Sequence, residues 1–361
     1  MKYLYPFALA LLLISCQKEE KKVIDRTKAD WDFYKLKGDV KSVLTKSWSV
    51  NDNLEKQKTL HEQASDHDSQ ITFDDQGLLI KEDLFLRDAP FQQNTFNGRE
   101  KKQQTLQFMG NAVGIKTDYT WDATGKNNTS IIRRNPDNTQ IDRIEMKYQG
   151  DKLAEKITYS AQDNPIDKIT YMYDSKGNLN LENIYLSSEY IQYTAIYKYN
   201  DKNKKVFEGR YDKDSKMIYE TKYQYDNDGN VLKKITIDKN GEIEYSEDFT
   251  YDKKGNMLTR LTFEKYDNSK TIDRYAYDSN GNQIKRNLTK NDVSLMDVNI
   301  TFDKNNNQTS YVVTETSGKQ LVKRGYTYEY DANGNWTKKT ILIDDKPKFL
   351  VERQITYLEQ Q

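Results

Sequence analysis

Two residue types that often carry catalytic chemistry are nearly missing from this chain. Its 361 residues include one cysteine, Cys16, and two histidines, His61 and His67. A single thiol excludes an internal disulfide, and so few nucleophiles and bases leave little material for the common cysteine- or histidine-dependent active sites. No glycine-rich phosphate loop is present either. Enzymatic activity is therefore the least favoured class of function, and we expect no cofactor.

Apolar residues are also scarce. They make up 35% of the chain against 31% charged residues, whereas ordinary globular domains are about 45–50% apolar. This composition excludes one thick hydrophobic interior. Disorder is the alternative for so polar a chain, but 27 tyrosines and a strict rhythm of strand and turn signals argue against it.

An excess of charge of either sign is absent. The 56 basic and 56 acidic residues balance, and removing residues 1–15, which contain Lys2 and no acid, leaves 55 minus 56, or −1. Nucleic-acid binding depends on neutralising phosphates with a basic surface. The sequence therefore excludes nucleic acid as a partner.

What the chain does have is a repeat with a period of 26 residues. A Tyr-Asp-x-x-Gly-Asn signal recurs at this interval, interrupted only at Tyr199-Asn200, and weaker copies extend it to nearly everything after Gly38. A fixed period of this length predicts an array of similar supersecondary units. The residues that define the repeat are Tyr173, Asp174, Gly177, Tyr225, Asp226, Gly229, Tyr251, Asp252, Gly255, Tyr277, Asp278, Gly281, Tyr330, Asp331 and Gly334.

Each unit has the turn signals of a β-hairpin. In Asp-x-x-Gly the aspartate opens a type I turn and the glycine takes the left-handed conformation that closes it, and most units carry a second turn halfway along. Alternate residues before each closing aromatic are aromatic too, as in Tyr219, Tyr223 and Tyr225, so one face of the sheet should be a tyrosine ladder. We predict an all-β fold, with about nine to twelve antiparallel hairpins in one long curled or spiral sheet.

The first twenty residues predict a different kind of feature. An apolar run from Tyr3 to Ile14 follows Lys2, is too short to span a membrane and is typical of a secretory signal. It leads into Leu13-Ile14-Ser15-Cys16, which resembles the bacterial lipobox. That resemblance implies cleavage of residues 1–15 and lipidation of Cys16; the alternative is an ordinary signal peptide with an incidental cysteine.

The residues after Cys16 indicate where in the cell the protein is located. Gln17, Lys18, Glu19 and Glu20 look like the export signal of Bacteroidota-type surface lipoproteins, which implies an outer-membrane lipoprotein exposed at the cell surface. The alternative is a solvated charged tether. We divide the chain into a signal peptide (1–15), a lipidated cysteine with a polar tether (16–35), degenerate repeats or a cap (36–121) and the regular hairpin repeats (122–361).

The Tyr-Asp-x-x-Gly-Asn units resemble the YD-repeat (RHS-like) family, and the opening from Leu36 to Val43 looks like the start of small Bacteroidota lipoproteins of that class. The resemblance implies spiralling antiparallel sheets. Large members of the family enclose a toxin in a hollow shell. The units here are longer and the last strand ends near Tyr357, which argues against a payload and against a closed shell.

Two metal motifs are weak. His61 and His67 lie in a polar stretch with acids, but their spacing matches no familiar zinc motif, and a solvated loop is the expected structure. Asp226 to Asn230 could begin a calcium loop, yet Ile237 stands where the closing glutamate belongs. A hairpin turn explains the same residues, so we expect no metal.

Three classes of function remain. The first is a non-catalytic surface module for binding or adhesion, in which tyrosine rings stack on a glycan or a protein ligand is held. The second is a structural or assembly scaffold of the cell envelope, periplasmic or at the surface, that holds another protein at a sheet edge or in a groove. The third, an enzyme, is the least favoured, and membrane contact comes only from the lipid at Cys16.

Overall fold

A computed structural model describes residues 24–63, 66–186 and 190–359, and these residues form 25 β-strands and no helix. Every strand pairs with its neighbours in antiparallel fashion within a single sheet, as the repeat predicts. The strands are β1 Val40–Val50, β2 Lys56–Thr59, β3 Asp68–Phe73, β4 Leu79–Leu86, β5 Ala89–Phe96, β6 Lys102–Met109, β7 Ala112–Trp121, β8 Asn128–Arg134, β9 Gln140–Gln149, β10 Lys152–Tyr159, β11 Pro165–Tyr173, β12 Leu179–Leu186, β13 Ile191–Tyr199, β14 Lys205–Asp212, β15 Met217–Tyr225, β16 Val231–Asp238, β17 Ile243–Tyr251, β18 Met257–Glu264, β19 Ser269–Tyr277, β20 Gln283–Lys290, β21 Val293–Phe302, β22 Gln308–Glu315, β23 Gln320–Tyr330, β24 Trp336–Ile343 and β25 Lys346–Tyr357.

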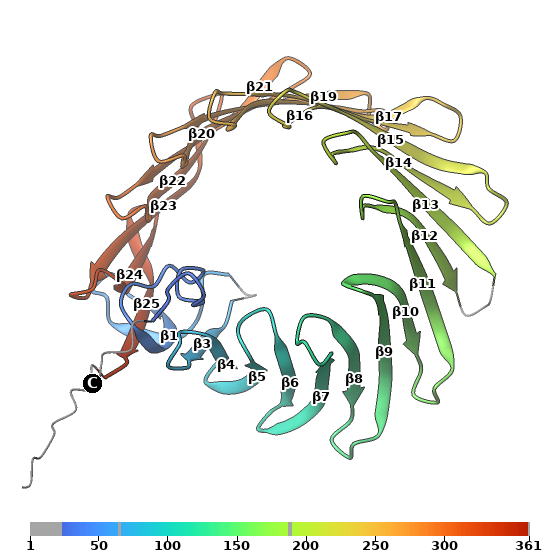
Figure 1. The fold of residues 1–361 in the computed structure, drawn as a ribbon. Helices are drawn as coiled ribbons and strands as arrows, with labels where there is room; N and C mark the ends of the chain where they lie inside the picture. The colour runs from blue at the N-terminus through green and yellow to red at the C-terminus, as the bar shows by residue number, and fades with distance from the viewer. Residues whose placement is uncertain (1–23, 64–65, 187–189, 360–361) are drawn as a thin grey trace, which may run out of the picture.

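The sheet closes on itself, which corrects the expectation of a curled or spiral sheet. The first strand, β1, pairs with the last, β25, from Val40 opposite Tyr357 to Ser49 opposite Phe349, and its other edge pairs with β3. The short β2 pairs only with the end of β1, so 25 minus 1, or 24, strands form the ring in Figure 1. Closure is favourable because it pairs the backbone groups that both terminal edges would otherwise expose.

A ring of this size is too wide to be filled by its own side chains. Neighbouring strands lie about 4.8 Å apart, so 24 of them give a circumference of roughly 115 Å, and closed sheets of about 16 strands already leave open space inside. The accessible surface is 23818 Å², against about 15,000 Å² for a compact protein of this mass. The 30 residues that the structure does not describe would account for at most roughly 5,000 Å² of this difference if they were fully exposed. The excess therefore reflects a sheet with two accessible faces.

The repeated turns have the geometry that their sequence demands. In one of them the Asp226 N–H donates to the Asn230 carbonyl and the Gly229 N–H donates to the Asp226 carbonyl. The Asp226 carboxylate accepts from the Asn230 backbone N–H at 2.8 Å and from its side-chain amide at 2.9 Å. Gly229 has a φ of 88°, which glycine adopts without steric cost. The register of β15 with β16 shifts at Tyr225, as a bulge beside such a turn requires.

In several units a tyrosine hydroxyl bonds to the backbone of the preceding strand. The Tyr225 hydroxyl donates to the Lys205 carbonyl at 2.6 Å, and the same bond spans 20 residues at four other closing tyrosines, Tyr148, Tyr173, Tyr199 and Tyr251. We call this bond the tyrosine latch. It pairs a phenol with a backbone carbonyl at the start of the neighbouring strand, so each latch fixes the register of successive hairpins.

The densest core lies where the ring closes. Trp31, which is 0% exposed, packs with Leu36 against Val40, Phe73 and Leu79, and its indole N–H donates to the Val40 carbonyl at 2.8 Å. Residues 24–39 thus form a folded cap, which lies inside the ring near β1, β3 and β25 in Figure 1. The sequence assigned residues up to 35 to a tether, but those from 24 onward belong to this cap.

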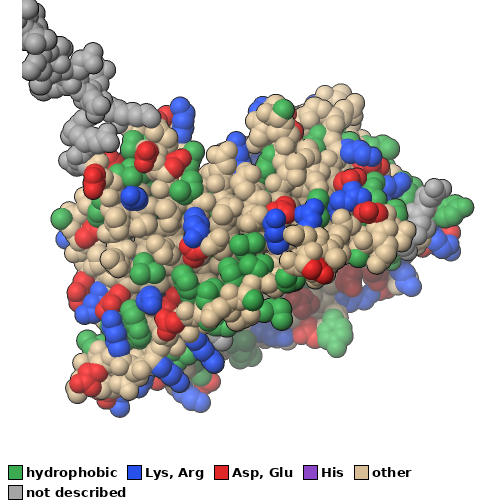
Figure 2. Space-filling view, turned by 90° about the horizontal axis from the view of Figure 1, so that it is seen from below, with side chains coloured by type: hydrophobic (Ala, Val, Ile, Leu, Met, Phe, Trp, Pro, Cys, Tyr) green, Lys and Arg blue, Asp and Glu red, His purple; other side chains and the backbone are tan. Residues whose placement is uncertain are grey.

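The cap shows which face of the sheet points inward. Ile71, Phe73, Ile355 and Tyr357 contact its core, and they lie on the same face of the sheet as the tyrosine ladder, because side chains alternate along each strand. The inner face therefore carries the tyrosines. Figure 2 shows part of the outside, where Lys and Arg are interspersed with Asp and Glu.

Candidate functional site

The place where the sheet closes departs from the regular repeat. We call β23, β24, β25, β1 and β3 the seam, and β14 to β20 the array. Strands of the array have eight or nine residues, whereas β23 has 11 and β25 has 12. The latch at the seam is made by Tyr328, whose hydroxyl donates to the Gln308 carbonyl at 3.0 Å. The longer unit leaves Tyr330 free to donate to Asp303 instead, at 2.5 Å.

A pocket lies on the inner face of the seam between the cap and the loop before β3. The cap covers the register pair Ile355 and Val43, and the next inner pairs are Arg353 with Thr45 and Val351 with Ser47. Ser47 holds the loop, because its hydroxyl donates to the Leu60 carbonyl and its carbonyl accepts the Leu60 N–H. The pocket therefore has a floor of strands and folded chain on two sides.

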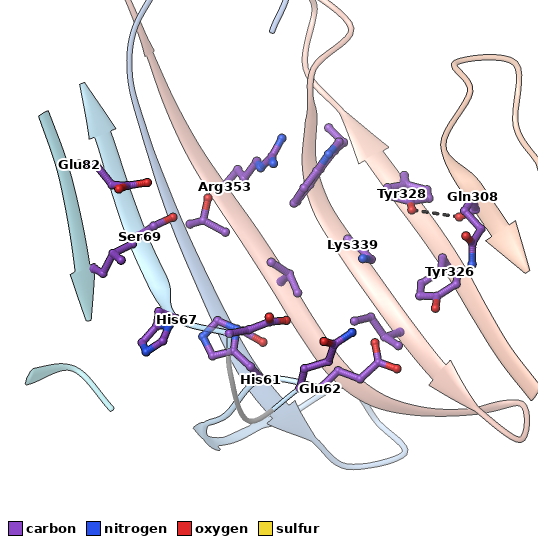
Figure 3. A pocket seen from close by; sticks show the side chains of 18 residues that line it. His61, Glu62, His67, Ser69, Glu82, Gln308, Tyr326, Tyr328, Lys339 and Arg353 are labelled. Carbon is purple, nitrogen blue, oxygen red and sulfur yellow. Dashed lines mark hydrogen bonds between the residues drawn. The ribbon is translucent and has the colours of Figure 1, made fainter. Parts of the chain in front are cut away.

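The pocket has a volume of about 630 Å³, within the range of small-molecule sites. Figure 3 shows that the sheet supplies Arg353, Lys339, Tyr326, Tyr328 and Gln308, while the loop supplies His61 and Glu62. Its lining is Thr45, Ser47, His61, Glu62, Gln63, Asp66, His67, Ser69, Glu82, Leu84, Gln308, Tyr326, Tyr328, Trp336, Lys339, Ile341, Val351 and Arg353.

Arg353 is the most unusual group in the pocket. Its guanidinium lies 3.6 Å from the centre of the Trp336 ring, and its Nε is buried without a hydrogen-bond partner. Among the described residues, no carboxylate lies within 4.0 Å of it. Burial lowers its pKa from 12.5 to about 10, so the side chain is still a cation at neutral pH. A charge held in this way lacks the partner that buried charges normally have.

Lys339 is a second cation of the same kind. Its ammonium lies 4.9 Å from the centre of the Tyr326 ring, and no carboxylate of the described chain pairs with it within 4.0 Å. Burial lowers the pKa of Lys339; Glu62 opposes that shift and Arg353 adds to it. The register places Lys339 beside Val351, two residues from Arg353. The two Cβ atoms are diagonal neighbours, about 7–8 Å apart, so one ligand can reach both cations.

Acidic groups occupy the other parts of the pocket wall. The Glu62 carboxylate pairs with the Arg324 guanidinium, and Glu82 accepts from the Asn94 amide at 2.7 Å. Asp66 completes the acidic lining. The pocket therefore contains charges of both signs, with unpaired cations on β24 and β25 and acids on the loop before β3 and on β4.

The inner face of the array contains cations too, but four of them have carboxylate partners. Asp273 is 1% exposed and accepts from Arg260 and from Arg286 at 2.7 Å each. Lys205 and Lys234 meet glutamates at 2.6 Å and 3.5 Å. The Asp273 carboxylate raises the pKa of Arg260, the opposite of what happens to Arg353.

The two histidines lie in a loop, as the sequence predicts, but both are partly buried and not fully solvated. His61 is mostly buried, and its Nε2 lies 2.9 Å from Asp68 Oδ1, although the direction of approach leaves Nε2 without a hydrogen bond. That carboxylate oxygen accepts the Ser47 N–H instead. The His67 ring stacks on Phe91 at 4.4 Å. Within the described ranges, no three His, Cys, Asp or Glu side chains gather as a metal site requires.

The other residues singled out from the sequence lie away from this pocket. The repeat-defining aspartates and glycines form the turns at one rim of the ring, where Gly177, Gly229, Gly255, Gly281 and Gly334 have φ values of 81–88°. The Asn178 amide holds the pKa of Asp174 below its usual range, which is a turn interaction. Cys16 and Gln17 to Glu20 lie outside the described residues. Among the residues that are described, none belongs to a helix capable of crossing a membrane.

Sequence reasoning missed the pocket, including Arg353, Lys339 and Trp336. One signal was available: the repeat interval lengthens from 26 to 28 residues between Phe302 and Tyr330, next to Trp336, which is the first residue of β24. A unit of irregular length in a regular repeat indicates a place where the structure departs from the repeated hairpin.

Comparisons with known proteins leave the family open. No protein-family model and no curated protein matches the chain. A crystal structure of TcdB2-TccC3-TEV is similar over 82% of this chain and 18% of its own length, at 13% identity and a TM-score of 0.31. A porin-like protein from Bacteroides uniformis is similar over 59% of this chain and 94% of its own, at 13% identity and a TM-score of 0.26. The chain thus spans about a fifth of the first structure, and likenesses this distant carry no argument about function.

Proposed function

We propose that this chain is a non-catalytic binding protein of the bacterial cell envelope, and that its ligand occupies the seam pocket. The observation that carries the proposal is the pair of partly buried cations, Arg353 and Lys339, that line one cavity without a carboxylate partner among the described residues. Burying an unpaired charge costs free energy. An anionic ligand would remove that cost, so the arrangement suits a protein whose pocket is filled in use.

The walls of the pocket support binding over catalysis. Trp336, Tyr326 and Tyr328 offer flat aromatic surface, and Thr45 and Ser69 offer hydroxyl groups. These groups orient a ligand by stacking and hydrogen bonds. His61 is the nearest approach to a catalytic base, but its contact with Asp68 lacks hydrogen-bond geometry.

The proposed location in the cell rests on the sequence. The lipobox-like run ending at Cys16 and the acidic stretch after it favour an outer-membrane lipoprotein exposed at the cell surface, and the Tyr-Asp-x-x-Gly-Asn units favour a relative of the YD-repeat family. Lipidation with more than one acyl chain gives stable anchoring. Mass spectrometry of the mature N-terminus tests this part, because an unmodified Cys16 would contradict it.

Closure of the sheet weighs against a scaffold that holds its partner at a sheet edge. A scaffold that works by adding a strand needs a long free edge, and pairing of β1 with β25 uses up both terminal edges. The four-residue β2 is the only strand of the described sheet that stands outside the ring. A pocket is therefore the better candidate for the functional surface.

The test uses the chain carrying Cys16→Ser, which removes the lipid and keeps every described residue. The protein is screened against glycan and peptide arrays, and each hit is measured again with Lys339→Gln. We expect a loss of affinity of about tenfold or more, because a charge-assisted hydrogen bond disappears.

The matched control is Lys338→Gln, which changes the neighbouring lysine of β24 on the outer face, where it pairs with Glu329 at 3.0 Å. It should leave binding unchanged. Ligands that bind equally well to wild type and Lys339→Gln, or the absence of any hit, would contradict the proposal.

A further inference from the structure

We infer that the ligand of the seam pocket is an acidic saccharide with a single carboxylate, such as a uronic acid joined to neutral sugars, whose carboxylate binds between Arg353 and Lys339. This inference rests on the proposed function and adds the chemical class of the ligand.

The arginine defines the charged end of the ligand. Stacking on Trp336 at 3.6 Å fixes the plane of the guanidinium. Its Nε is buried, so the edge that a ligand can reach is formed by the two terminal Nη groups, which have no acceptor among the described residues. A guanidinium with a free edge is matched by a planar carboxylate, which accepts two parallel N–H bonds. Lys339, one strand away, can donate to the same group as a point charge.

The size and lining of the pocket define the rest of the ligand. About 630 Å³ is more than a lone carboxylate or inorganic ion fills. Thr45, Ser69 and Gln308 give the lining neutral hydrogen-bonding groups, and Tyr326 and Tyr328 add amphipathic rings. A body with many hydroxyl groups and one flat apolar face, as a sugar ring has, satisfies both kinds of surface.

The acids at the margin limit the charge of the ligand. Glu62, Asp66 and Glu82 line the same cavity, and a second anionic group placed near them would be repelled. Polysulfated or polyuronate chains are therefore poor ligands. The same acids can accept hydrogen bonds from sugar hydroxyls, so they favour neutral sugars next to the charged one.

Isothermal titration of the Cys16→Ser chain tests the inference with three disaccharide probes. They are a glucuronic acid joined to xylose, the methyl ester of the same compound, and the neutral glucose–xylose analogue. We expect the acid to bind and the ester and neutral analogue to bind about 10- to 100-fold more weakly, because each loses the charge-assisted hydrogen bonds.

Protein variants locate the site. Arg353→Gln should weaken binding of the acid by at least about tenfold and leave the weak binding of the ester unchanged. Arg210→Gln is the matched control: Arg210 is an inner-face arginine of β14 that lies 4.7 Å from the centre of the Tyr193 ring, far along the sheet from the pocket. It should bind the acid like wild type.

The outcomes separate this inference from the proposed function. Equal binding of the acid and its ester, or binding of the acid that ignores Arg353→Gln, would overturn the carboxylate site. If the saccharides fail to bind but a peptide from the screened peptide library binds, and Lys339→Gln weakens that binding, the saccharide class is wrong and the proposed binding function of the pocket stands. If no compound of either kind binds, both are wrong.

Discussion

The array and the seam are built from the same strand and turn signals, yet two groups of inner-face charges in them have different surroundings. In the array, Arg260 and Arg286 converge on the buried Asp273, so these three inner-face charges offset one another. In the seam, Arg353 and Lys339 point into a pocket and no carboxylate of the described chain pairs with them. The difference indicates that charge at Asp273 holds neighbouring strands of the array together, whereas Arg353 and Lys339 have no such partner, and it is this difference on which the proposed ligand site rests.

The largest effect should follow from breaking the charge network of the array. Asp273→Ala leaves two arginines facing each other without a counter-ion, and removing one partner of a buried ion pair costs about 3–5 kcal/mol. Both guanidiniums are about one-third exposed, so screening reduces the expected loss of unfolding free energy to about 2–4 kcal/mol. Urea denaturation measures it.

Asp201→Ala is the control for that variant. Asp201 is fully exposed, and its ion pair with the Lys176 ammonium is long, at 3.9 Å. It should not change stability measurably. A loss below about 1 kcal/mol for Asp273→Ala would show that the array does not depend on its charges.

The next prediction compares two turn glycines, Gly77 beside the cap and Gly255 in the array. A Cβ at Gly77 would lie 2.8 Å from Ala29 and from Trp31 of the cap, whereas a Cβ at Gly255 would meet nothing closer than 3.9 Å. Both residues have positive φ. Gly255→Ala should cost about 1 kcal/mol in backbone strain, and Gly77→Ala about 1–3 kcal/mol more because it overfills the packed cap.

Denaturation and tryptophan fluorescence report on these glycine variants together. Gly77→Ala should also expose Trp31, which is fully buried, and so shift its emission to longer wavelength. Equal losses for the two variants would mean that the cap does not pack tightly on the seam.

A smaller effect comes from the tyrosine latch. Tyr225→Phe removes the bond to the Lys205 carbonyl and keeps the ring, so unfolding free energy should fall by about 0.5–1.5 kcal/mol. Tyr328→Phe removes the corresponding bond to Gln308 and should cost the same. A much larger loss for Tyr328→Phe would show that the seam depends on its latch more than the array does.

The smallest effect is a change in alkaline behaviour. Burial lowers the pKa of Lys339 below 10.5, so between the two values the unfolded chain binds more protons and stability rises with pH. Burial raises the pKa of tyrosines such as Tyr223 above 10.0, so their contribution is lost as pH rises beyond that value. Lys339→Met should therefore lose stability more steeply than wild type as pH approaches 10. Identical pH profiles would contradict the burial of Lys339.

Much of the fold follows from short-range signals in the sequence. Asp226 and Gly229 determine their turn through local hydrogen bonds and a positive φ, so the turns, the antiparallel pairing and the tyrosine face could all be predicted. Closure could not, because the pairing of Val40 with Tyr357 joins residues from opposite ends of the chain, and no local pattern encodes it.

The candidate site was harder to predict for the same reason. Arg353 and Thr45 become neighbours only through closure, and Trp31 and Leu36 are buried because the cap folds onto the closed edge. His61 drew notice in the sequence as a metal ligand, but in the structure it belongs to the loop that borders the pocket. What distinguishes Arg353 from Arg260 is the absence of a carboxylate opposite it, and the sequence alone does not show which residues lie opposite.

The most direct test of this account is the unfolding free energy of the double variant Lys339→Met and Arg353→Met, measured in urea without ligand. Methionine keeps much of the side-chain volume and removes both charges. Because these cations are partly buried and have no carboxylate partners among the described residues, we expect the variant to be as stable as wild type or more stable. A loss of about 2 kcal/mol or more, similar to that expected for Asp273→Ala, would show that the seam cations hold the fold together and would contradict their assignment to a ligand.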